Sequence, residues 1–64
     1  MNDRPEILGS VVICDEWQQD LGEVFELANG QYEAKLPNEK TIGIFPSAVM
    51  AEQALRALAN RQSW

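Results

Sequence analysis

The sequence contains no histidine and only one cysteine, Cys14. Without histidine, acid–base catalysis near neutral pH and triads of the Ser-His or Cys-His kind lose their usual residue. A lone cysteine forms neither an intrachain disulfide nor a metal cluster, so we expect a reducing, cytoplasmic location. No apolar run approaches the roughly 18 residues of a membrane span, and the polar start is not typical of a signal peptide. We therefore expect a protein that is not an enzyme, needs no cofactor or metal, and does not enter a membrane.

The length of the chain limits the number of domains and the size of the core. A chain of 64 residues, 45% of them hydrophobic, suffices for a single domain over residues 1–64 and is too short for two. A domain of this size buries only about 60% of the surface that its unfolded chain exposes. A deep, water-free catalytic cavity is therefore not expected.

The net charge of −5 is unevenly placed along the chain. Residues 1–39 carry a net charge of −7, and residues 40–64 carry +2. Six acidic residues follow one another from Asp15 to Glu33 without an intervening base, which disfavours nucleic-acid binding. An acidic first half favours a basic protein partner, or serves solubility alone.

The clearest local signal is Asn29-Gly30 between two segments of alternating polarity. It predicts a β-hairpin of strands 23–28 and 31–36 with a two-residue type I′ turn. That turn would pair Leu27 with Tyr32 and place one set of side chains on the core face: Phe25, Leu27, Tyr32, Ala34 and Leu36. The opposite face would then carry Glu26 directly across from Glu33.

Three further elements complete the predicted fold. Residues 7–14 are rich in β-branched side chains and are predicted to form a strand. Residues 41–45 are predicted to form another strand, after a turn at 37–40. An odd loop there, which we favour, places Ile42 and Ile44 with the core set; an even loop places Thr41, Gly43 and Phe45 there. Ser47 is expected to cap a helix over residues 48–60.

The helix is amphipathic at 3.6 residues per turn. Polar positions such as Glu52 and Arg56 lie on one side of the helix. The apolar positions form a stripe on the opposite side: Ala48, Ala51, Ala54, Leu55, Leu58 and Ala59. The predicted fold class is α+β, a three- or four-stranded antiparallel sheet with one C-terminal helix packed on one face. The other sheet face and an edge strand would stay open for a partner or a second copy.

Residues 31–59 resemble two families. QYEAKLP followed by FPSAVMAEQAL is similar to the HicB antitoxin pattern, through Tyr32, Ala34, Pro37, Ser47, Ala51, Ala54 and Leu55. YEA followed by IGIFPSAVMAEQAL resembles the arm-binding domain of tyrosine integrases and the plant ethylene-responsive DNA-binding domain, through Tyr32, Ala34, Gly43, Phe45, Ser47, Ala51 and Ala54. The first resemblance implies a toxin partner and a non-catalytic role. The second implies DNA binding, although those families place Arg and Trp where Glu26 and Glu33 are expected here.

The leading hypothesis is a small acidic protein-interaction module, a regulator or inhibitor that presents an acidic sheet face to a basic partner. Its candidate partner-binding residues are Trp17, Glu23, Glu26, Glu33 and Trp64. The alternatives are a homodimer through the open face, and a nucleic-acid-binding module that uses Lys40, Arg56 and Arg61. For Trp17 the edge of the core competes with a binding role, and Cys14 is expected to be buried.

Overall fold

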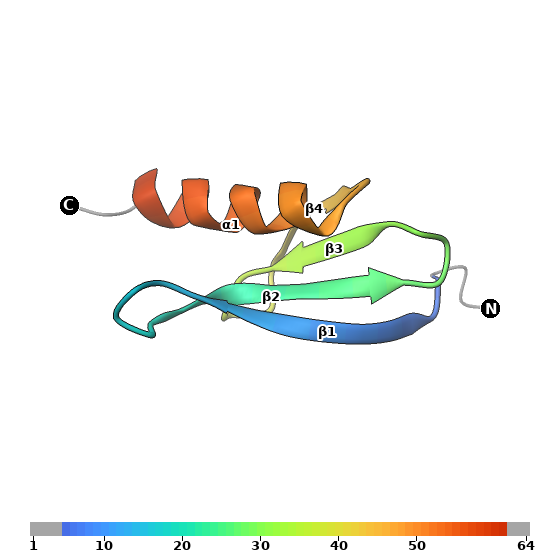
Figure 1. Ribbon diagram of the computed structural model, residues 1–64, viewed down its shortest axis with the longest axis horizontal. Coiled ribbons are helices and arrows are strands. Elements are labelled where there is room, and N and C mark those ends of the chain that lie inside the picture. The colour runs from blue at the N-terminus through green and yellow to red at the C-terminus, as the bar shows by residue number, and fades with distance from the viewer. Residues whose placement is uncertain (1–4, 62–64) are drawn as a thin grey trace.

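The computed structural model describes residues 5–61, which form a four-stranded antiparallel sheet and one helix (Figure 1). The strands are β1 (Ile7–Cys14), β2 (Asp20–Leu27), β3 (Tyr32–Lys35) and β4 (Thr41–Phe45), and the helix is α1 (Ala48–Arg61). The strand order in the sheet is β1-β2-β3-β4. The predicted α+β class, with one C-terminal helix on one sheet face, is confirmed.

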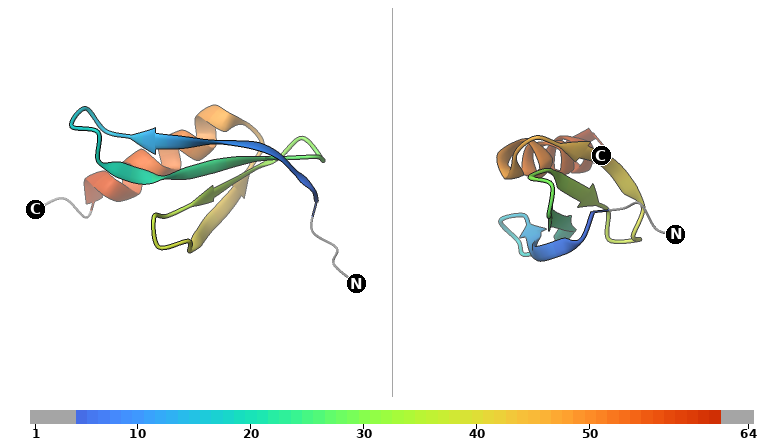
Figure 2. Two further views of the ribbon diagram at one scale, coloured as in Figure 1. Left: turned by 90° about the horizontal axis from the view of Figure 1, so that it is seen from below. Right: turned by 90° about the vertical axis from the view of Figure 1, so that its right-hand side faces the viewer.

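Helix α1 covers only part of the sheet. It contacts β2, β3 and β4, whereas β1 lies farthest from it, at the other side of the sheet (Figures 1 and 2). The core between helix and sheet is a cluster of small and branched side chains: Ile13, Val24, Ala34, Ala51 and Leu55. Because β1 contributes only Ile13 to this cluster, most of that strand lies outside the core.

The strand pairing defines which residues share a face. Two cross-strand rows lie on the helix side, Val11–Val24–Ala34–Gly43 and Gly9–Glu26–Tyr32–Phe45. Two other rows lie on the open side, Ser10–Phe25–Glu33–Ile44 and Val12–Glu23–Lys35–Thr41. Small residues thus dominate the row directly beneath the helix, and the charged residues of the central strands lie mostly on the open side.

The helix begins and packs as its sequence predicts. Ser47 accepts a hydrogen bond from the N–H of Met50 at 3.2 Å, which caps the first turn. Ala51 and Leu55 of the apolar stripe are fully buried. The expected Glu52–Arg56 pair forms with an N–O distance of 3.0 Å. Within the described residues the helix extends to Arg61, one residue beyond the predicted end.

All three strand connections use one loop geometry. The connections span residues 15–19, 27–31 and 36–40. In each of these five-residue segments, the N–H of the first residue donates a hydrogen bond to the carbonyl of the fifth. The N–H of the fourth residue donates to the carbonyl of the first. The fourth residue has positive φ each time: Gln18 (63°), Gly30 (88°) and Glu39 (70°). This is a three-residue loop, a type I turn followed by a bulge residue in the left-handed region.

The predicted register of the central hairpin is wrong by one residue. Tyr32 pairs with Glu26 and Ala34 with Val24, so Phe25 and Leu27 lie on the open face and Val24 takes the core position. Leu27 is still buried there, with 4% of its surface exposed. Asn29 does not have the positive φ that a type I′ turn requires, and the loop contains three residues. A shift of one position moves each side chain of a strand to the other face.

The turn before β4 has the favoured odd loop, yet the predicted burial of Ile44 is wrong. A bulge separates the pair Lys35–Thr41 from the pair Ala34–Gly43, so the extra residue, Ile42, reverses the alternation. Gly43 and Phe45 therefore share the helix side, as the even-loop alternative required. Ile42 still packs against the core, whereas Ile44 is exposed on the open face.

Candidate functional site

Strand β1 forms an edge of the sheet and exposes apolar side chains on both faces. Val11 lies on the helix side and is 56% exposed, and Val12 lies on the open side and is 52% exposed. Ile7 and Leu8 are also exposed, and the segment ILGSVVIC contains no charged residue and no proline. Edge strands are usually protected by such residues. Strand β1 is therefore an unprotected edge within the part of the chain that the structure describes.

The outer side of β1 carries backbone groups that no described strand pairs with. The N–H of Leu27 donates to the carbonyl of Gln31, so the backbone groups of Leu27 face β3. Because these groups alternate in direction along an antiparallel strand, the N–H and C=O groups of the even-numbered residues of β2 face β1. Their partners in β1, such as Val11, direct N–H and C=O back to β2. Ser10 and Val12 consequently direct their N–H and C=O groups outwards.

Carboxylates surround this apolar edge. Residues 6–27, called here the acidic ribbon, contain six acidic residues: Glu6, Asp15, Glu16, Asp20, Glu23 and Glu26. The first basic residue after position 4 is Lys35. Glu6, Glu16, Asp20 and Glu26 are exposed. The ribbon thus combines an uncharged strand with negative charge at its ends and along its neighbour.

The tip of the acidic ribbon is an ordered turn that exposes Trp17. The Asp15 carboxylate accepts hydrogen bonds from the backbone N–H groups of Trp17 and Gln19, at 2.9 and 2.8 Å. Trp17 is 75% exposed, so the expectation that it closes the core edge is wrong. Cys14 is also exposed, against the prediction of burial. Both errors have one cause: β1 and its turn extend away from the surface that α1 covers.

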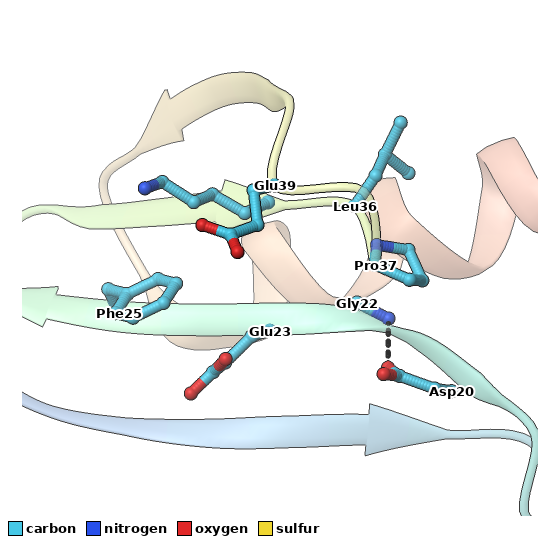
Figure 3. Close-up of a pocket in the computed structure, with 8 residues that line it drawn as sticks. Asp20, Gly22, Glu23, Phe25, Leu36, Pro37 and Glu39 are labelled. Atoms are coloured by element: carbon cyan, nitrogen blue, oxygen red, sulfur yellow. Dashed lines mark hydrogen bonds between the residues drawn. The ribbon is translucent and has the colours of Figure 1, made fainter.

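The open face of the central strands is not a free acidic surface. Glu23 accepts a hydrogen bond from the Ser10 hydroxyl at 2.7 Å and lies across from Lys35. The Lys35 ammonium lies 5.3 Å from the centre of the Phe25 ring, a cation–π contact. A shallow hollow of about 260 Å³ opens here, with Asp20, Glu23 and Glu39 among its lining residues (Figure 3). Lys35 therefore offsets part of the negative charge of this face.

The predicted pairing of Glu26 with Glu33 is also wrong. Glu26 lies on the helix-side row and is exposed, whereas Glu33 lies on the open-side row and is only 2% exposed. The Glu33 carboxylate accepts a hydrogen bond from Thr41 Oγ1 at 2.6 Å. It lines a second hollow of about 330 Å³, between Leu27 and Ile44. Glu23, Glu26 and Glu33 thus do not form one contact surface, because the one-residue register shift places Glu26 on the other face.

The basic residues of the alternative hypothesis do not form a patch on the helix. Arg56 is engaged by Glu52, and Arg61 lies five residues further on, about 140° around the axis. Lys40 lies in the loop before β4. Trp64, the remaining candidate, lies outside the described residues. Trp17, Glu23 and Glu26 therefore all lie on the acidic ribbon, with Glu23 and Glu26 on opposite faces, and Glu33 is buried on the open side of β3.

No group of three or more Cys, Asp or Glu side chains within residues 5–61 is arranged to hold a metal ion. Both hollows are shallow and lie on the open sheet face. None of the helices in the described part has the length and apolarity needed to cross a membrane.

No protein-family model matches the chain, and neither a curated protein nor a solved structure matches it. The resemblances to HicB antitoxins and to integrase arm-binding domains therefore stay predictions. The exposed strand β1 contains none of the site residues predicted from the sequence. Its signal is the run Val11-Val12-Ile13, which is apolar at successive positions although only Ile13 is buried.

Proposed function

We propose that the chain is a non-enzymatic protein-interaction module whose acidic ribbon binds a basic partner. The observation that carries the proposal is the exposed, uncharged strand β1 within a ribbon of six acidic and no basic residues. Isolated exposed apolar residues are common, whereas a row of them on both faces of an edge strand marks an interaction site. The surrounding carboxylates select the sign of the partner's charge and accelerate encounter.

The proposed role is that of a regulator or inhibitor. The lack of histidine and the shallow hollows support a role through binding rather than catalysis. The proposed compartment is the cytoplasm, since the exposed thiol of Cys14 stays reduced there. The same negative charges oppose close approach of two copies, so a partner of opposite charge is favoured over a homodimer.

The partner is first isolated from the native cell and identified by mass. Its affinity for variants that lack single carboxylates then tests the proposal. The variant Glu26→Gln removes one exposed ribbon charge, and we expect it to weaken partner binding about threefold. Glu39→Gln is the matched control, because Glu39 is an exposed acid in the loop before β4. Wild-type affinity should also fall as salt rises from about 0.01 to 0.15 M. Equal effects of both changes, or an affinity insensitive to salt, would contradict the proposal.

A further inference from the structure

We infer that the partner binds by strand addition: an extended segment in which two apolar residues are followed by two basic residues pairs with the outer edge of β1. This inference rests on the proposed function and specifies how the acidic ribbon recognises its partner. In strand addition, main-chain hydrogen bonds provide affinity, and side chains at alternate positions provide specificity.

The backbone of β1 is prepared for such pairing. Ser10 and Val12 direct N–H and C=O outwards, as the pairing of Gly9, Val11 and Ile13 with β2 requires. The register is regular from Gly9 to Ile13, and the nearest bulges lie at the two ends of that stretch. An added strand can therefore continue the sheet without distortion over these five residues.

The exposed side chains of β1 match a segment with apolar residues on both faces. Val11 on the helix side and Val12 on the open side are each more than half exposed, and neither is covered by α1. Cross-strand pairs of β-branched and apolar side chains stabilise a sheet by a few tenths of a kcal/mol to about 1 kcal/mol each. A partner strand would cover both valines from the side.

Charge selects basic residues at the two neighbouring positions of the added strand, opposite Ser10 and Gly9. Glu26 lies directly across from Gly9, which has no side chain, and a Cβ built at Gly9 meets nothing within 4 Å. A Lys or Arg of the added strand that lies opposite Gly9 can thus extend over it towards Glu26. On the other face, Glu23 beside Ser10 offers a second carboxylate. A second copy of β1 cannot supply these cations, because the segment contains no basic residue.

The decisive variant is Val12→Pro. The N–H of Val12 faces outwards, so proline removes a donor from the free edge and leaves the β1–β2 hydrogen bonds intact. Val12→Thr is the matched control, since it keeps the N–H and the β-branched shape. We expect Val12→Pro to weaken binding about tenfold or more, because one hydrogen bond is lost and the ring obstructs pairing, and Val12→Thr to change it less than about threefold.

The probe is a blocked peptide that repeats the sequence Val-Val-Lys-Lys, titrated into the ¹⁵N-labelled full chain at low salt. Binding should slow amide exchange at Ser10 and Val12, and an otherwise identical peptide with N-methylated backbone should bind about tenfold more weakly. The N-methylated probe keeps the test valid if Val12→Pro does not fold. A peptide with glutamate in place of lysine is the charge control and should not bind.

The outcomes separate the two proposals. If the basic peptide binds with salt sensitivity, while Val12→Pro and N-methylation leave the affinity unchanged, strand addition is wrong and the charge-based proposal stands. If no basic peptide binds at low salt, both are wrong. If sedimentation shows a dimer of the chain alone that Val12→Pro dissociates, the edge is occupied by a second copy and the inferred basic partner is wrong.

Discussion

The two edges of the sheet differ in how they are supported. Strand β4 continues into helix α1, which packs over β2, β3 and β4, and its residues Ile42 and Phe45 contact the core. Strand β1 is held almost entirely by pairing with β2 and contributes one buried side chain, Ile13. Hydrophobic burial therefore stabilises one half of the molecule, and the other half depends mainly on backbone hydrogen bonds. The half with less burial is the one whose apolar residues remain available for a partner.

Truncation of side chains in the two halves gives the largest contrast. Leu55 of α1 is fully buried against the sheet, so Leu55→Ala should lower the free energy of unfolding by about 2–5 kcal/mol. Val12→Ala removes apolar atoms from an exposed edge position, and its cost should stay below about 1 kcal/mol. Urea unfolding followed by far-UV circular dichroism measures both. Similar losses for the two variants would show that β1 is covered in solution and would contradict the comparison.

Addition of one methyl group tests how closely the helix approaches the sheet. A Cβ at Gly22 would lie 2.7 Å from Leu55 Cδ2 and against the Lys35 carbonyl, and Gly22 has a φ of 142°. We expect Gly22→Ala to cost about 1–3 kcal/mol. Gly9→Ala, where a Cβ meets nothing within 4 Å, is the matched control and should be neutral or slightly stabilising. Equal tolerance of both changes would mean that α1 does not pack against Gly22.

The sequence predicted the elements better than their register. The turn at residues 37–40, the Ser47 cap and the burial of Ala51 and Leu55 follow from local rules, and the structure confirms them. Ala48, also predicted for the apolar stripe, is exposed. Asn29-Gly30 fits two turns, because both place Gly30 at positive φ and differ in Asn29 and in loop length. Side-chain size distinguishes them: the observed register puts Val24 beneath the close-packed helix, where Phe25 would be too large. This size limit comes from tertiary packing, so the sequence of the turn does not reveal it.

The candidate site was predicted in part for the same reason. The negative charge of the acidic ribbon follows from the sequence, because it depends only on residue order. The common face of Glu26 and Glu33 does not, since it depends on the register. The exposure of Trp17 depends on where α1 ends over the sheet, which no local pattern records. The residue order therefore predicts the charge of the proposed interaction surface but not its location.

The smallest effect we predict compares the turns of the two halves. Glu39 and Gln18 occupy the same left-handed loop position, with φ of 70° and 63°, where side chains other than glycine are strained. Glu39→Gly should raise the free energy of unfolding by about 0.5–1 kcal/mol, and Glu39→Gln controls for the lost charge. Gln18→Gly relieves the same strain at the tip of the acidic ribbon. If this tip opens locally before the covered half unfolds, the relief raises the free energy of global unfolding by less than Glu39→Gly does. Equal gains in urea unfolding would show that the ribbon tip and the helix-covered half unfold as one unit.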